Sequence, residues 1–170
     1  AMGLLIWNPY PFQILELKTF DYLIMNTEVV QNENILIVDI DEETVKTYEG
    51  WPLPRSVYGD AIMQTEAIPG ITVLMPNKDL RGPMQDDYFI RRLEVRPTVL
   101  ASAASTQVTG TNPHVGTAQL GEDPTPWLYQ YPGILPTEST LESKTKGLGL
   151  VTATPEIDGV TRRIPLVVNV

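Results

Sequence analysis

The chain has 170 residues, 42% of them hydrophobic, which is enough for one globular domain with a real core. Acidic residues outnumber basic ones by 21 to 12 and give a net charge of −9, which argues against nucleic acid as a partner because that affinity comes from cationic side chains. The absence of cysteine excludes disulfides and cysteine-ligated zinc. None of the P-loop, GxGxxG, GxSxG and HExxH motifs occurs, so the sequence indicates no cofactor and no catalytic residues.

The first eleven residues are expected to lie outside the domain proper. Residues 3–7 are apolar, but this run is far shorter than the ~20 residues that cross a bilayer. We interpret residues 1–11 as a cloning-derived or juxtamembrane segment. Residues 12–25 follow with apolar side chains at 14, 17, 20 and 24, a spacing that predicts an amphipathic helix lying on a sheet.

Residues 35–38, Ile-Leu-Ile-Val, are an unbroken apolar run that ends in Asp39 and Asp41. Such a run predicts a strand buried on both faces. Acidic residues after Asp41 suit the first turn of a short helix, and Gly50 ends it. Residues 51–55, Trp-Pro-Leu-Pro-Arg, form a stiff turn, and Ser56 is expected to cap a second helix over residues 57–67.

The remaining elements alternate between strand and helix. Strands are predicted at 70–75, 98–102 and 147–152, and helices at 85–93 and 137–146, with the strand at 70–75 parallel to the one at 35–38. A loose segment over 106–133 has a short strand at 116–121. The Asp158-Gly159 pair predicts a hairpin turn into residues 161–170. That last apolar run continues to Val170, which indicates a truncated C-terminus.

The fold class that follows is α/β. We predict a single domain over residues 1–170, with a mixed, mostly parallel central sheet flanked by helices and a C-terminal hairpin.

The acidic end of the first strand is the first candidate site. Asp39 and Asp41 would project to the same face of a strand, and with Asp79 they could hold Mg²⁺ or Ca²⁺. The alternative is that they cap the next helix and pair with Arg55 or Arg81. The Asp-x-Asp pattern is similar to that of haloacid-dehalogenase-like phosphatases, although Glu43 stands where that family has Thr or Val.

Two residues of the turn at 51–55 are further candidates. Trp51 could stack on a ligand, or pack its large surface beneath the turn. Arg55 could bind an anion together with helix N-terminal amides, or form an internal ion pair with Asp39 or Asp158. Arg162 and Arg163 are adjacent on an extended run, so at most one of them can join a common site.

Three stretches of the chain resemble the three characteristic blocks of the type 2 CHASE domain (cyclase/histidine-kinase-associated sensory extracellular domain). They are ILIVDIDEETVKTYEGWPLPRSVYGDAI, DLRGPMQDDYF and KGLGLVTATPEIDGVTRRIPL, in this order. The resemblance covers residues 15–170. The matching positions are Trp51, Pro52, Pro54 and Arg55; Asp79, Asp86 and Asp87; and Asp158, Gly159, Arg162, Arg163, Pro165 and Leu166. One departure is Met75, which stands where the family often has a carboxylate.

The resemblance implies a non-catalytic, extracytoplasmic ligand-sensing domain of a bacterial transmembrane receptor. One membrane helix would precede it and several would follow, leading to an adenylate or other nucleotide cyclase, a histidine kinase of a two-component system, or a serine/threonine kinase. We expect a periplasmic or extracellular location at the cell membrane, an unidentified small ligand and a homodimer. The candidate ligand-binding residues are Asp39, Asp41, Trp51, Arg55, Asp79, Asp158 and Arg162. The alternatives are a small metal-dependent hydrolase or phosphatase using Asp39 and Asp41, and a structural module that dimerises a receptor.

Overall fold

The computed structural model describes residues 9–28, 33–107 and 120–169. The chain divides into two compact units. The first comprises Ala1–Asp39 and Thr154–Arg162, and the second comprises Ile40–Ala153 and Arg163–Val170.

The first unit is built on one long helix, α2 (Tyr10–Met25). Pro9 caps it and a second proline lies in its first turn, where the missing amide proton leaves no helical hydrogen bond unmade. The helix predicted at 12–25 is therefore confirmed, while its packing on a sheet stays a prediction. Leu17 is buried, whereas side chains such as Leu15 and Leu23 are 62% and 60% exposed.

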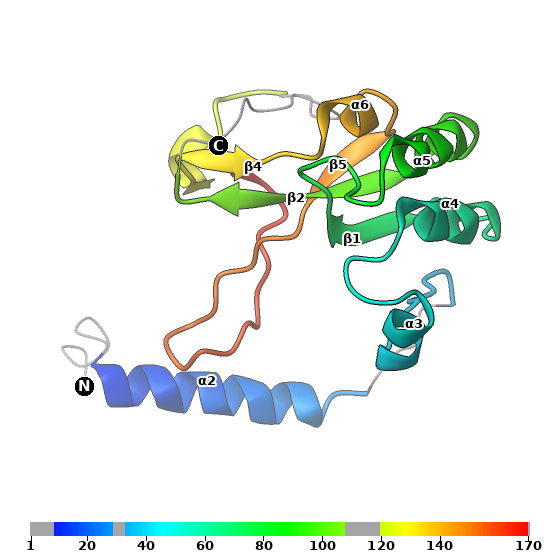
Figure 1. Cartoon of the computed structure of the whole chain (residues 1–170). Coiled ribbons are helices and arrows are strands. Elements are labelled where there is room, and N and C mark those ends of the chain that lie inside the picture. Colours follow the sequence, from blue (N-terminus) through cyan, green and yellow to red (C-terminus); the bar gives the residue numbers. More distant parts are fainter. Residues whose placement is uncertain (1–8, 29–32, 108–119, 170) are drawn as a thin grey trace. The chain divides into compact units, whose positions relative to one another are not determined.

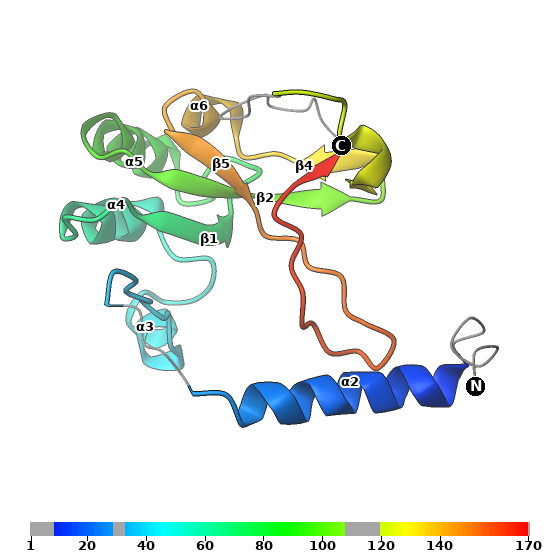
Figure 2. The ribbon, with the colours of Figure 1, turned by 180° about the vertical axis from the view of Figure 1, so that it is seen from behind.

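The second unit contains the sheet (Figure 1). Strand β2 (Val99–Ser105) pairs in parallel with β1 (Gly70–Leu74) and with β5 (Gly147–Leu150). The C-terminal part of β2 also pairs with β4 (Gly133–Leu135) in the antiparallel direction. The prediction of a mixed, mostly parallel α/β sheet is confirmed. Figure 2 shows from behind that β2 lies between β1 and β5.

Two helices cover the unit's core and pack against each other. They are α4 (Arg55–Met63) and α5 (Pro83–Val95). Gly59 lies at their contact, where a Cβ would meet Arg92 Cγ at 3.2 Å and Tyr88 Cδ1 at 3.3 Å, so a larger residue would require these side chains to shift. The buried apolar residues between these helices and the sheet are Leu53, Tyr58, Ile62, Met75, Phe89, Leu93, Leu100 and Leu141.

The smaller elements of the second unit are α3 (Glu42–Thr47), η1 (Thr125–Trp127), β3 (Tyr129–Gln130), α6 (Ser139–Glu142) and β6 (Val168–Asn169). β6 pairs with β3 in parallel. The predicted helix at 137–146 is thus shorter than expected. Residues 116–119 of the predicted strand at 116–121 lie outside the described residues, and residues 120 and 121 are not in a strand.

The prediction of a buried first strand is wrong. Residues 35–38 have no strand conformation, and their side chains are 66–86% exposed. The strand predicted at 70–75 is parallel as expected, but its partner is β2. A continuous apolar run reports only that a segment avoids water; being buried as a strand also requires a neighbouring strand, which local sequence does not specify.

Two local predictions also need correction. α4 begins at Arg55 after Pro54, with no side-chain cap, so Ser56 is not the capping residue. The turn at Asp158-Gly159 does form, since the Gly159 N–H donates to the Glu156 carbonyl at 2.8 Å. Its flanking segments are not strands, however, so no hairpin ladder is present there in the described part of the chain.

Candidate functional site

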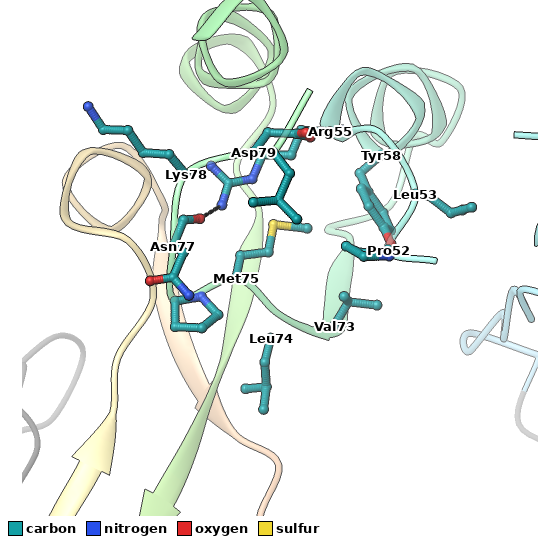
Figure 3. A pocket seen from close by; sticks show the side chains of 12 residues that line it. Pro52, Leu53, Arg55, Tyr58, Val73, Leu74, Met75, Asn77, Lys78 and Asp79 are labelled. Carbon is teal, nitrogen blue, oxygen red and sulfur yellow. Dashed lines mark hydrogen bonds between the residues drawn. The ribbon is translucent and has the colours of Figure 1, made fainter. Parts of the chain in front are cut away.

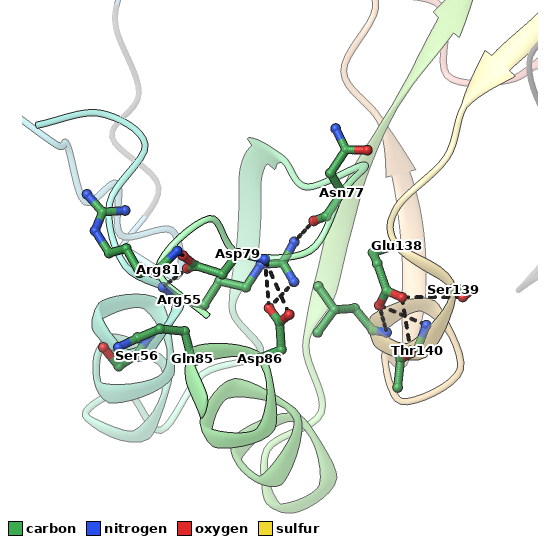
Figure 4. A network of polar contacts seen from close by, with 11 residues as sticks. Arg55, Ser56, Asn77, Asp79, Arg81, Gln85, Asp86, Glu138, Ser139 and Thr140 are labelled. Carbon is green, nitrogen blue, oxygen red and sulfur yellow. Dashed lines mark hydrogen bonds and ion pairs between the residues drawn. The ribbon is translucent and has the colours of Figure 1, made fainter. Parts of the chain in front are cut away.

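Arg55, at the first position of α4, lies at the centre of a buried polar cluster (Figure 4). Its guanidinium forms an ion pair with Asp86, in the first turn of α5, and donates to the Asn77 carbonyl in the loop after β1. The Arg55 and Asp86 side chains are only 5% and 11% exposed. The prediction that Arg55 forms an ion pair with Asp39 or Asp158 is therefore wrong, because its ion-pair partner is Asp86.

Asp79, in the loop after β1, also belongs to this cluster. Its carboxylate accepts the Arg55 backbone N–H at 2.9 Å and the Arg81 backbone N–H at 2.8 Å. The next amide of α4, that of Ser56, donates to Gln85 Oε1 at 3.1 Å. The first amides of α4, considered as an anion site from the sequence, thus already have acceptors from the protein itself.

A cavity of about 180 Å³ adjoins this cluster, beside β1 and the start of α4 (Figure 3). Its wall is mainly apolar, and Arg55 and Asp79 contribute to its polar edge. The principal apolar lining residues are Leu53, Tyr58, Val73, Leu74, Met75 and Leu80.

Tyr58 lines this wall, and its hydroxyl is buried. The residue is 6% exposed, and among the described residues its hydroxyl has no hydrogen-bond partner of normal geometry. Burial raises the pKa of the phenol, which the nearby Leu53 backbone partly offsets, so the hydroxyl stays protonated at neutral pH.

The first unit contains a second arginine cluster. Arg162 donates from Nε and Nη2 to the two carboxylate oxygens of Asp21 at 2.6 and 2.8 Å, and from Nη1 and Nη2 to those of Asp158 at 2.8 and 2.7 Å. The Glu156 carboxylate is 3.5 Å from its Nη1. These hydrogen bonds hold the pKa of Asp158 well below its usual range, lower the pKa of Asp21, and raise that of Arg162.

The remaining predicted site residues lie apart from these clusters. Asp41 caps α3, because its carboxylate accepts the Thr44 N–H at 2.8 Å and the Thr44 hydroxyl at 2.7 Å; these bonds lower its pKa. Asp39 is exposed. Trp51 is 57% exposed, so the expectation that it packs beneath the turn is wrong.

The structure thus brings together Arg55 with Asp79, and Asp158 with Arg162, from the seven predicted residues. Sequence reasoning misses two important site members, Asp86 and Tyr58. The position of Asp86 predicts a solvated helix-dipole acid, but the residue is 7% exposed. Nothing in the local pattern singles out Tyr58 except its place on α4, shortly after the WPLPR turn.

The described residues show neither a metal-binding cluster nor a membrane-spanning helix. No group of three or more His, Cys, Asp or Glu side chains within residues 9–28, 33–107 and 120–169 is arranged to hold a metal ion. The helices in the same described ranges include none with the length and hydropathy of a membrane span.

A family model, the CHASE2 domain, matches residues 1–170. The chain therefore belongs to the CHASE2 family, a class of extracellular, non-catalytic sensory domains of signalling receptors. Searches of curated proteins and of solved structures gave no match.

Proposed function

We propose that this chain is the ligand-sensing part of a bacterial transmembrane receptor and lies on the periplasmic or extracellular side of the cell membrane. The observation that carries the proposal is the CHASE2 match across residues 1–170. Membrane helices that flank the domain pass its signal to a cytoplasmic nucleotide cyclase or kinase. The domain itself binds and does not catalyse.

The cavity beside β1 is the ligand site that we favour. It is concave and mainly apolar with a few polar groups at one edge, which is the usual composition of small-molecule sites. Its walls come from α4, from β1 and from the loop that holds Arg55 through Asp79, so a ligand would contact several elements at once. A signal requires that the ligand bind two conformations with different affinity.

The test is a thermal-unfolding screen of the 170-residue chain against metals, anions and small metabolites, with and without chelator. A ligand at a hundredfold excess over its Kd should raise the free energy of unfolding by about 2.7 kcal/mol. Leu80→Trp enlarges a lining residue that is 89% exposed, so it should obstruct the cavity and abolish the shift. Val95→Trp, on the exposed end of α5, is the matched control and should keep it.

Two outcomes would contradict this proposal. One is a flat screen with a cooperatively folded protein. The other is a hit whose shift is equal in wild type and Leu80→Trp, because that ligand binds elsewhere.

A receptor dimerisation module is a second candidate function, favoured by the surface of α2. Apolar side chains from both ends of this helix are exposed, including Phe12 at 50% and Met25 at 84%. Covering them requires a partner, and we propose a second copy of the chain. Sedimentation across protein concentration should show a dimer that Leu15→Lys with Leu23→Lys converts to monomer. A monomer at every concentration would contradict it.

A further inference from the structure

A second hollow, of about 460 Å³, lies between the loop after β1 and α6. It shares only Pro76, Asn77 and Lys78 with the cavity beside β1. Its volume is within the range of small-molecule sites. It also lies at the carboxyl end of β1, the end of a parallel sheet at which ligands usually bind. Both its size and its place therefore suit a small ligand.

Two hydrogen bonds hold the walls of this hollow together. The Glu138 N–H donates to the Met75 carbonyl at 2.8 Å, and the Thr137 hydroxyl donates to the Ala101 carbonyl of β2 at 3.0 Å. Thr137 and Met75 are both buried. The segment that leads into α6 is thus fixed against the sheet and against the loop after β1, so the opening does not depend on a mobile wall.

The hollow is lined by one ammonium group and two carboxylates. The Glu138 carboxylate is engaged by α6, because it accepts the Thr140 N–H at 2.9 Å and the Leu141 N–H at 3.1 Å (Figure 4). Its negative charge therefore already has donors from the protein.

Lys78 and Glu142 differ from Glu138 in this respect. Among the described residues, neither of their charged groups has an ion-pair or hydrogen-bond partner. Lys78 is exposed and Glu142 is half-buried. Figure 3 shows the Lys78 side chain extending away from Tyr58 and Leu53, and so away from the cavity beside β1. The second hollow thus offers a ligand two uncompensated charges of opposite sign.

We propose that this hollow binds a small zwitterion of the α-amino acid type, with its carboxylate toward Lys78 and its ammonium toward Glu142. A ligand with a single charge would leave one of these two side chains unpaired, whereas a molecule with both charges is attracted at both ends. The inference goes beyond the sensing proposal, because it assigns a second site and the chemical class of its ligand.

The experiment uses four probes that share one side chain and differ in charge. L-leucine carries both charges, L-leucinamide only the ammonium, N-acetyl-L-leucine only the carboxylate, and N-acetyl-L-leucinamide neither. Affinities for the 170-residue chain are measured by NMR titration of backbone amides. L-leucine should bind roughly two- to fivefold more tightly than each singly charged probe, the range expected for one solvent-accessible ion pair. The uncharged probe should bind most weakly.

Two variants assign the charges to their partners. Lys78→Met should abolish the advantage of L-leucine over L-leucinamide, and Glu142→Gln should abolish its advantage over N-acetyl-L-leucine. Lys46→Met removes an exposed lysine of α3 and should change neither comparison. Leu80→Trp, which obstructs the cavity beside β1, should leave L-leucine affinity unchanged, because Leu80 does not line the second hollow.

Three results would overturn the proposal. The first is L-leucine binding no more tightly than a singly charged probe. The second is an L-leucine affinity that both Lys78→Met and Glu142→Gln leave unchanged. The third is loss of L-leucine binding in Leu80→Trp, which would place the ligand in the cavity beside β1.

Discussion

The two arginine clusters of this protein balance the charge of a buried guanidinium in different ways. Arg55 is matched to one carboxylate, that of Asp86, and both side chains are almost inaccessible to water. Arg162 meets two aspartates and has Glu156 nearby, an excess of negative charge that Lys18 partly offsets at 3.8 Å from Asp21 and Asp158. Arg162 and Asp158 are as buried as the Arg55 pair, at 4% and 11%, but Asp21 is 33% exposed, so water reaches part of this cluster and reduces the cost of its charge imbalance. We therefore expect the Arg55 pair to be intolerant of mutation and the Arg162 cluster to be sensitive to acid.

The largest expected effect is from breaking the buried pair. Asp86→Asn leaves the Arg55 guanidinium buried without its counter-charge, so the free energy of unfolding should fall by about 3–5 kcal/mol. Urea denaturation measures this loss. The double variant Arg55→Met, Asp86→Leu removes both charges and should recover most of the stability. A double variant no more stable than Asp86→Asn would show that the cluster acts through more than charge matching.

The next largest losses of stability are expected from replacing a glycine with an unusual backbone conformation beside each cluster. Gly82 precedes α5 and Asp86 with φ 110° and ψ 167°, a region open almost only to glycine, so Gly82→Ala should cost about 1–3 kcal/mol. Gly159, beside Arg162, has φ 80°, and Gly159→Ala should cost somewhat less, about 1 kcal/mol. A Cβ has open space at both positions, so the cost is conformational. Thermal unfolding of both variants tests the order, and equal or absent losses would contradict it.

A smaller effect, present at neutral pH and reduced in acid, is expected from Arg162→Met. The pKa values of Asp21 and Asp158 are lowered in the fold from 3.8, so their contribution is complete above that value and is lost as pH falls through the lower folded pKa values. Wild type should therefore lose stability below about pH 4, and Arg162→Met should lose less over the same range. Denaturation midpoints at pH 7 and pH 3 provide the measurement. Parallel profiles for the two proteins would contradict the assignment of acid sensitivity to this cluster.

The smallest effect should come from Lys18→Met. The Lys18 side chain is 61% exposed and its ammonium is 3.8 Å from each aspartate, so water screens the attraction. We expect a denaturation midpoint indistinguishable from wild type at physiological salt. A clear loss would mean that the excess negative charge around Arg162 needs this ammonium.

Much of the second unit's framework could be predicted from its sequence. β1 begins at Gly70, directly after Pro69, and β2 begins shortly after Pro97, so both apolar runs start where a proline predicts a boundary. The α5 helix is equally clear from its apolar spacing. Residues 35–38 mislead because their pattern is that of a buried strand, and pairing is a property of the whole sheet.

The candidate site could be predicted in part. Pairing of Asp79 with Arg55 or Arg81 is one of the two alternatives that the sequence leaves open, and the structure joins the Asp79 carboxylate to the backbone N–H groups of both arginines. Asp86 has the same local pattern as any acid in a first helical turn, so its burial could not be read from sequence. The charge partner of Arg162 at position 21 is 141 positions away, a separation at which no spacing rule operates.

The exposed run at residues 35–38 has a consequence for the protein in concentrated solution. Four consecutive β-branched or leucine side chains open to water have the composition of a segment that stacks into cross-β assemblies. Asp39 and Asp41 follow directly, and their like charges oppose stacking of identical chains. Acidification neutralises carboxylates, so thioflavin fluorescence of the concentrated protein should rise at low pH. Ile37→Lys should suppress that rise.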